Sequence, residues 1–166
     1  METHMSFYRR KLPHIQKDAA RHFITFVTFD RMILPDWARD LVLRSCVHED
    51  GKRCNLHAAV VMPDHVHLIL TPLLDTEAKR TNRLPEILQG IKSASAHAIA
   101  KRIGSKLIWQ EESFDHLLRS SESLDAKMLY LLQNPVRTGL VAVWSEYPWI
   151  WHKPFPNPYS PESLPS

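Results

Sequence analysis

The strongest structural pattern in the chain is Met62-Pro63-Asp64-His65-Val66-His67-Leu68-Ile69-Leu70-Thr71. After Asp64 it alternates and is rich in Val, Ile and Leu, a pattern typical of a β-strand with one buried face. Residues i and i+2 of a strand point to the same face, so we expect His65 and His67 to leave the sheet side by side, with Val66 on the other face. Two neighbouring imidazoles can hold one divalent metal ion.

Hydrophobic periodicity and turn signals place three further strands and three helices around this segment. The predicted strands cover residues 22–29, 55–62, 65–71 and 107–118. The predicted helices cover residues 35–46, 84–103 and 124–134, the last two with Gly104 as stop signal and Ser123 as N-cap. Residues 72–83 are interpreted as a charged loop. The order β-α-β-β-α-β plus one helix predicts an α+β fold with a ferredoxin-like antiparallel sheet and an extra C-terminal helix that carries Tyr130.

Length and charge are those of one globular domain with a mild basic excess. The chain has 166 residues, with 21 Lys and Arg against 18 Asp and Glu. Such a balance permits nucleic acid as a partner without requiring it. We expect a basic N-terminal arm over residues 1–20, one folded domain over 21–152 and a loose tail over 153–166. In the arm, Arg9, Arg10 and Lys11 follow Tyr8 and could touch phosphates, although a solvated tail is the alternative.

The two cysteines, Cys46 and Cys54, are too few for a disulfide framework at this size. A zinc site with His48 and His57 is conceivable, but the spacing fits no compact zinc pattern, and two reduced, partly buried thiols are the better interpretation. No stretch reaches the apolar length that spans a bilayer, and residues 1–20 contain no apolar signal segment. We therefore expect a cytoplasmic protein that makes no use of a membrane.

Tyr130 and Asn134 are four residues apart on the last predicted helix, so they should share one face. Pro135 cannot continue the hydrogen-bond ladder, which places Asn134 at the helix tip. Its amide oxygen is an acceptable ligand for Mg²⁺ or Mn²⁺, whereas a simple C-cap is the alternative role. A tyrosine hydroxyl is a weak nucleophile unless its electrophile is polarised, as a phosphate bound to a metal ion would be.

In three blocks the chain resembles the single-tyrosine HUH transposases, and within them the REP-associated tyrosine transposases of bacteria. The resemblance spans about residues 22–150, and its carriers are residues 61–67, residues 109–116, and Tyr130 followed by residues 134–141. It implies a ferredoxin-like nuclease fold over residues 21–152. It also implies a divalent metal ion, Mg²⁺ or Mn²⁺, bound by His65 and His67 with Asn134 as a third ligand.

The resemblance further implies that Tyr130 attacks the scissile phosphate of single-stranded DNA. This step leaves a 5′-phosphotyrosine link and a free 3′-hydroxyl, which can later reverse the reaction on another strand and so join DNA. Relatives recognise hairpins of repetitive palindromic elements and work as monomers or homodimers. Two other functions stay open: a module that grips hairpin DNA without cutting it, and a metal-dependent phosphoesterase that uses water and does not need Tyr130.

Further candidate DNA contacts come from basic and aromatic residues near these blocks. Arg137 lies one turn beyond Asn134 and could meet a phosphate, as could Lys92 on the long helix, for which a solvated position is the alternative. A cleaved strand could stack on Trp109. His57 and His116 are ambiguous, and hydrogen-bonded structural histidines are the favoured interpretation of both.

Overall fold

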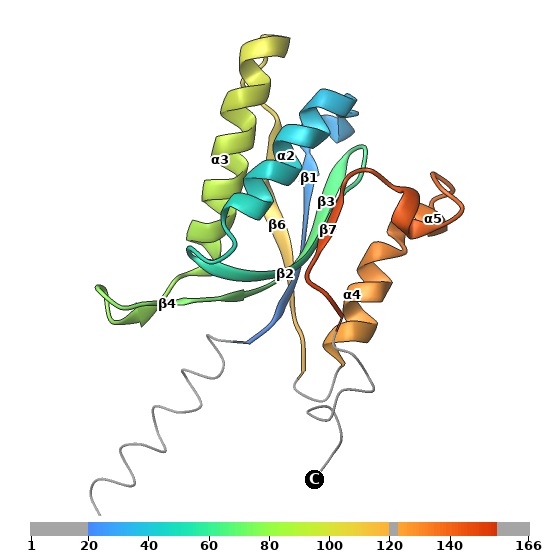
Figure 1. Cartoon of the computed structure of the whole chain (residues 1–166). Coiled ribbons are helices and arrows are strands. Elements are labelled where there is room, and N and C mark those ends of the chain that lie inside the picture. The colour runs from blue at the N-terminus through green and yellow to red at the C-terminus, as the bar shows by residue number, and fades with distance from the viewer. Residues whose placement is uncertain (1–19, 120–122, 156–166) are drawn as a thin grey trace, which may run out of the picture.

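The computed structural model describes residues 20–119 and 123–155 (Figure 1). The predicted N-terminal arm, with its candidates Arg9, Arg10 and Lys11, lies outside the described residues, as do residues 156–166 of the predicted tail. Among the described helices, none has the length and apolar character needed to cross a membrane.

A five-stranded antiparallel sheet in the order β6-β1-β3-β2-β7 forms the centre of the molecule. The four strands predicted from the sequence are all present: β1 (His22–Thr28), β2 (Cys54–Val61), β3 (His65–Pro72) and β6 (Trp109–Leu117). With α2 (Asp36–His48) and α3 (Leu84–Ile103) between them, they follow the predicted β-α-β-β-α-β succession. The α+β class with an antiparallel sheet is thus confirmed.

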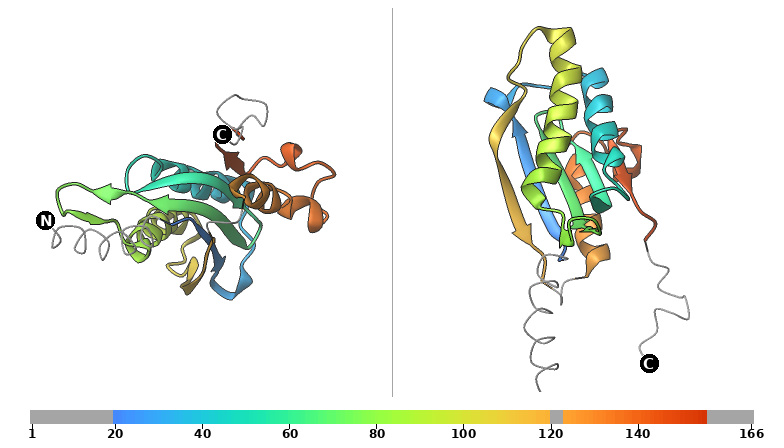
Figure 2. Two further views of the ribbon diagram at one scale, coloured as in Figure 1. Left: turned by 90° about the horizontal axis from the view of Figure 1, so that it is seen from below. Right: turned by 90° about the vertical axis from the view of Figure 1, so that its left-hand side faces the viewer.

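Helices cover both faces of the sheet (Figures 1 and 2). On one face α2 and α3 enclose the larger core, into which Ile24, Phe26 and Val66 point. On the other face α4 (Leu124–Leu132) buries Met128, Leu131 and Leu132 against β2 and β3. The alternation of β3 follows from this arrangement, because Val66, Leu68 and Leu70 lie in the larger core whereas Ile69 lies in the smaller one.

The predicted capping signals of the helices are confirmed. Gly104 ends α3 in a left-handed conformation with φ 72°, and its N–H donates to the Ala100 carbonyl. The Ser123 hydroxyl accepts a hydrogen bond from the Ala126 N–H at 3.4 Å and so caps α4. These local signals set where α3 ends and where α4, which carries Tyr130, begins.

The last predicted helix is wrong at its end. α4 stops at Leu132, and a separate four-residue helix, α5 (Asn134–Arg137), follows Gln133. Pro135 has no N–H to donate to the carbonyl four residues earlier, so the helical ladder is interrupted there. Asn134 is therefore the first residue of α5 and not the tip of the helix that carries Tyr130.

Three short strands were not predicted. β4 (Leu74–Asp75) and β5 (Arg80–Thr81) form a small hairpin within the segment interpreted as a charged loop. β7 (Ile150–His152) adds to the sheet beside β2. Strands of two or three residues are too short to show the alternation of a β-strand. β7 in addition forms only by pairing with β2, which is distant in the sequence. The Tyr147 hydroxyl anchors this C-terminal segment by donating to the Val61 carbonyl at 2.6 Å.

Both cysteines are free, as predicted, but they are fully buried and not partly buried. Cys46 on α2 and Cys54 on β2 lie in the larger core. Burial raises the pKa of the Cys54 thiol to about 12, and burial likewise raises the pKa of Cys46. Both thiols are therefore protonated at neutral pH and behave as small core residues.

Candidate functional site

His65 and His67 lie side by side at the beginning of β3, on the face opposite Val66. Their ring centroids are 4.7 Å apart and the ring planes are inclined by 80°. Val66 between them is fully buried in the larger core. The prediction made from strand alternation is confirmed, and the two imidazoles are close enough to share one ion.

Each imidazole is oriented by a hydrogen bond to its Nδ1 atom. The Nδ1–H of His65 donates to the Asp64 carboxylate, with 2.6 Å between Nδ1 and Oδ1. Nδ1 of His67 is 2.7 Å from the Thr25 hydroxyl, which lies directly across from it on β1. Partners of this kind at one ring nitrogen fix the ring and leave the other nitrogen for a metal ion. Thr25 and Asp64 were not singled out from the sequence.

Burial keeps His67 uncharged at neutral pH. Desolvation, followed by the charges of His65 and Arg137, lowers the pKa of His67 to about 4. A neutral imidazole has a lone pair to give to a metal ion, whereas a protonated one has none. The environment therefore holds His67 in the form that a metal ligand needs.

Tyr130 stands on the same side of the sheet as the histidine pair. Its side chain, on α4, is 57% exposed. The ring of Phe23, from β1, links the two features: its centroid is 5.7 Å from that of His67 and 6.4 Å from that of Tyr130. A single aromatic ring thus separates the candidate nucleophile from the candidate metal ligands, in one chain and without a partner subunit.

Arg137 lies against Tyr130. Its Cζ atom is 4.1 Å from the centroid of the Tyr130 ring, and its Nη2 donates to the Tyr130 carbonyl at 2.8 Å. Arg137 is exposed, and its charge also acts on His67. A guanidinium beside the candidate nucleophile is well placed to meet a phosphate.

Asn134 is half-buried at the start of α5. The residue that caps α4 is Gln133, so the alternative of Asn134 as a C-cap is wrong. Within residues 20–119 and 123–155, no three His, Cys, Asp or Glu side chains come together as a metal cluster, which removes the zinc alternative as well.

Lys92 and Trp109 belong to the core and not to a DNA-binding surface. Lys92 is only 9% exposed, and its ammonium donates to the carbonyls of Gln110 and Glu111 at 3.0 and 3.2 Å. The Trp109 indole N–H donates to the Ser95 hydroxyl at 3.0 Å. The burial of Lys92 fits neither the predicted phosphate contact nor the alternative of a solvated position. Trp109 is buried as well, so its ring is not available to stack on a DNA base.

The two ambiguous histidines differ from each other. His57 is buried, its Nε2 lies 2.9 Å from the Thr71 hydroxyl, and burial lowers its pKa to about 4. The structural interpretation of His57 is thus confirmed. His116 is exposed on β6, directly across from Phe23. Among the described residues, none makes a hydrogen bond with the His116 ring, so the interpretation of His116 as a hydrogen-bonded structural histidine is not confirmed.

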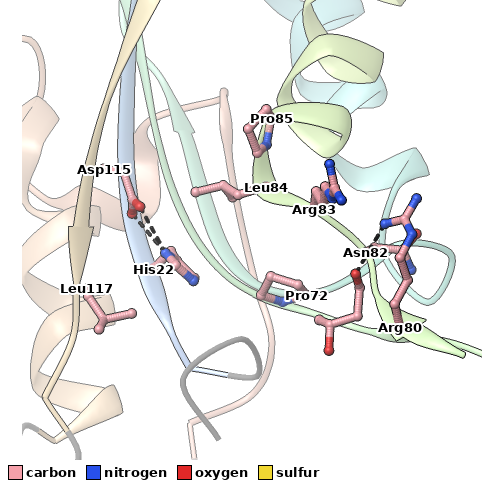
Figure 3. A pocket seen from close by; sticks show the side chains of 10 residues that line it. His22, Pro72, Arg80, Asn82, Arg83, Leu84, Pro85, Asp115 and Leu117 are labelled. Carbon is pink, nitrogen blue, oxygen red and sulfur yellow. Dashed lines mark hydrogen bonds and ion pairs between the residues drawn. The ribbon is translucent and has the colours of Figure 1, made fainter. Parts of the chain in front are cut away.

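A cavity at the far end of the sheet is separate from this site (Figure 3). It has a volume of about 570 Å³, and its lining includes Arg80, Arg83 and Leu84. His22 and Asp115, from the neighbouring strands β1 and β6, are hydrogen-bonded at one wall of it, with 2.9 Å between Nδ1 and Oδ1. Both residues lie on the face of the sheet that α3 covers, whereas the histidine pair lies on the opposite face.

The fold and the site define a class of protein: an antiparallel α+β sheet that carries paired histidines and an exposed tyrosine on one face. The family described as IS200-like transposase matches residues 16–124, about two thirds of the chain. The protein therefore belongs to the IS200-like transposase family, as its resemblance indicated. The matched residues include His65 and His67 and end before Tyr130.

Individual relatives agree with this assignment. A REP-associated tyrosine transposase of Escherichia coli is 32% identical over 93 residues, which is 56% of this chain and 51% of that protein. The chain thus matches about half the length of that relative. A putative REP-associated tyrosine transposase of Haemophilus influenzae is 26% identical over 160 residues, covering 87% of this chain and 84% of the relative.

A solved structure shares the fold. The structure of a REP-associated tyrosine transposase bound to a REP hairpin superposes with a TM-score of 0.65 and 23% sequence identity. The similarity covers 80% of this chain and 76% of that chain. At this identity the likeness establishes the fold, whereas residue roles have to be argued from this chain's own geometry.

Proposed function

We propose that the protein cleaves and rejoins single-stranded DNA through Tyr130, at hairpin DNA of the REP type, with a divalent metal ion held by His65, His67 and Asn134. One observation carries the proposal: the exposed Tyr130 lies on the same face as the oriented histidine pair, and Tyr130 and His67 both lie against the Phe23 ring. A metal-dependent phosphoesterase acting through water would not need a tyrosine in that position.

The residues present fit a divalent ion such as Mg²⁺ or Mn²⁺. The Nδ1 atoms of His65 and His67 are already hydrogen-bonded, so their Nε2 atoms are available to a metal ion. The Asn134 amide oxygen suits the same ions. When bound, such an ion would polarise a phosphate oxygen and make the phosphorus more electrophilic.

In the proposed reaction the Tyr130 hydroxyl oxygen attacks the scissile phosphorus. A bond forms between the tyrosine oxygen and phosphorus, and the bond from phosphorus to the 3′ oxygen breaks. The fragment downstream of the cut becomes linked to Tyr130 through its 5′ phosphate, and the upstream fragment leaves with a 3′-hydroxyl. The phenolic proton leaves to solvent and the departing 3′ oxygen takes one up. Attack by a 3′-hydroxyl on the linkage runs the same exchange backwards and joins strands, so no ATP is consumed.

Arg137 and Phe23 hold the nucleophile in place. The guanidinium stacks on the Tyr130 ring, and Phe23 contacts it from the sheet. The same guanidinium puts a positive charge where the attacked phosphate would approach. Hairpin DNA is proposed as substrate because a similar fold has been solved with a REP hairpin bound. A monomer or a homodimer acting in the cytoplasm is part of the proposal.

A covalent-adduct assay tests the proposal. The full chain is incubated with a labelled DNA hairpin bearing a single-stranded flank and Mn²⁺, and the products are separated on a denaturing gel. We expect a protein–DNA adduct that disappears with Tyr130→Phe and with EDTA, and persists with Tyr147→Phe, whose hydroxyl is buried. Binding without an adduct would favour a non-cutting module, and cleavage that survives Tyr130→Phe would favour a phosphoesterase.

A further inference from the structure

The face that carries the candidate site is only partly covered by helix. α4 packs on β2 and β3, where Ala58, Val60 and Ile69 contact it within the smaller core. Farther across the same face, on the edge strand β6, Phe114 is 65% exposed and His116 is exposed. The surface beside the histidine pair is therefore open to solvent on the β6 side.

Phe114 lies in the same cross-strand row as His67. Thr25 of β1 pairs with His67 on one side and with Phe114 on the other. Directly opposed residues of an antiparallel sheet point to the same face, and strands are about 4.8 Å apart, so two steps put Phe114 roughly 10 Å from His67. His116 occupies the next position of this face, across from Phe23.

Asp115 and Trp109 of β6 point to the opposite face. Asp115 pairs with His22 on the side that α3 covers, and Trp109 packs edge-on against Phe26 in the larger core at 4.9 Å. The alternation of β6 thus assigns its structural residues to one side and presents Phe114 and His116 on the other. We call these two residues the aromatic shelf.

We propose that the aromatic shelf receives an unpaired nucleobase of the DNA strand whose phosphate lies at the histidine pair, with Phe114 as the stacking ring. This inference rests on the proposed function and adds a substrate-positioning residue to it. An exposed aromatic ring supplies a π-face for any base, and the span of about 10 Å from His67 is short enough for the nucleotide next to the attacked phosphate.

The size of the shelf favours a base over a protein partner. A single exposed ring flanked by an imidazole is far smaller than the roughly 800 Å² that each partner buries in a standard protein interface. One ring is nevertheless sufficient to stack one base. The Arg137 guanidinium on α5, whose charge acts on His67, supplies attraction for the phosphate that precedes or follows that base.

A binding experiment with matched variants tests the shelf. The probe is a fluorescein-labelled DNA stem-loop with a single-stranded flank, used intact and with each flank nucleotide replaced in turn by an abasic residue. Cleavage is prevented by working in the Tyr130→Phe chain. We expect Phe114→Ala to weaken binding of the intact probe about 5- to 100-fold, and Phe114→Trp to restore it. Leu74→Ala, which removes another exposed apolar side chain, should change nothing.

The abasic series identifies stacking specifically. At one flank position, removal of the base should weaken binding to the unsubstituted shelf, and Phe114→Ala should then cause no further loss, because the two changes remove the same contact. Additive losses at every position, or unchanged binding by Phe114→Ala, would overturn the inference. So would a change of oligomeric state with Phe114→Ala in size-exclusion chromatography, which would make the shelf a contact between copies.

Failure of the shelf can be told apart from failure of the proposed function. If the chain with Tyr130 forms the covalent adduct while Phe114→Ala binds normally, only the shelf is refuted. If the chain neither binds the stem-loop nor forms an adduct, both proposals fall together.

Discussion

The Arg137 guanidinium lies 4.1 Å above the Tyr130 ring and donates to the Tyr130 carbonyl at 2.8 Å. One side chain from α5 therefore restrains both the ring of the candidate nucleophile and the backbone of α4. The turn at Gln133 brings Arg137 back over α4, so the interruption of the helix by Pro135 has a direct consequence for the site.

Removal of Arg137 should slow adduct formation more than it destabilises the fold. We expect Arg137→Ala to lower the single-turnover rate about 10-fold, since it removes a cation–π contact and a charge-assisted hydrogen bond, each of about 1 kcal/mol or more. Arg137→Lys should recover part of the rate, because an ammonium keeps the charge but not the planar stacking. Arg80→Ala serves as the control, and equal rates for the two alanine variants would contradict the role.

Folding stability should fall as the pH drops from about 6.5 towards 4. His67, with a pKa lowered to about 4 by burial, stays neutral in the folded chain at pH values where it binds a proton in the unfolded chain. The unfolded state then holds more protons, so stability rises with pH across this window. The contribution of His67 is of the order of 1–3 kcal/mol.

Urea unfolding at pH 7 and pH 5 measures this dependence without added metal. His67→Gln should reduce the difference in the free energy of unfolding between the two pH values. His57→Gln should do the same, because burial also lowers the pKa of His57 to about 4. His48→Gln, which changes an exposed histidine, should leave the dependence unchanged. An identical slope in His67→Gln and the unsubstituted chain would show that His67 titrates normally.

Lys92→Ala should destabilise the fold without altering the salt dependence of DNA binding. The buried ammonium satisfies carbonyls of Gln110 and Glu111, and its loss leaves them unpaired, at about 1–3 kcal/mol. Urea unfolding measures this loss. The plot of log affinity against log salt should keep its slope, whereas loss of a true phosphate contact would reduce the slope by about 1.

Thr25→Val should weaken metal binding although valine has nearly the same side-chain shape as threonine. The Thr25 hydroxyl lies 2.7 Å from Nδ1 of His67, and partners of this kind are worth about 10- to 100-fold in metal affinity. Isothermal titration with Mn²⁺ would measure the change. Thr71→Val on β3 is the matched control, since its hydroxyl lies 2.9 Å from the ring of His57, which is outside the site. Unchanged affinity in Thr25→Val would remove Thr25 from the site.

Asn134→Ala should reduce the stabilisation of the chain by Mn²⁺. An ion that binds only the folded state raises the melting temperature with concentration, and loss of one of three ligands shifts that response to higher concentration. We expect a shift of about 10-fold or more for Asn134→Ala and loss of the response for His67→Ala. If Asn134→Ala responds like the unsubstituted chain, the third ligand is another group.

The sequence predicted correctly those parts of the site that depend only on neighbouring residues of one strand or helix. His65 and His67 could be paired because alternation along a strand needs only neighbouring residues. Lys92 and Trp109 failed because their environments depend on how β6 approaches α3, a contact between segments that lie 18 and 14 residues apart. Phe114 carried no signal of its own, since its exposure follows from which strand lies at the edge.

Local residue patterns by themselves determined the four main strands, the three long helices and the side-by-side imidazoles, because each depends on periods and caps within a few residues. Which helix covers which face of the sheet depends on the tertiary structure alone. The same arrangement places the Phe23 ring between those of Tyr130 and His67. It also decided that β7 would close one edge while β6 left Phe114 exposed at the other. Such pairings join segments far apart in the chain, and their free energy comes from burial shared between them, which no single segment encodes.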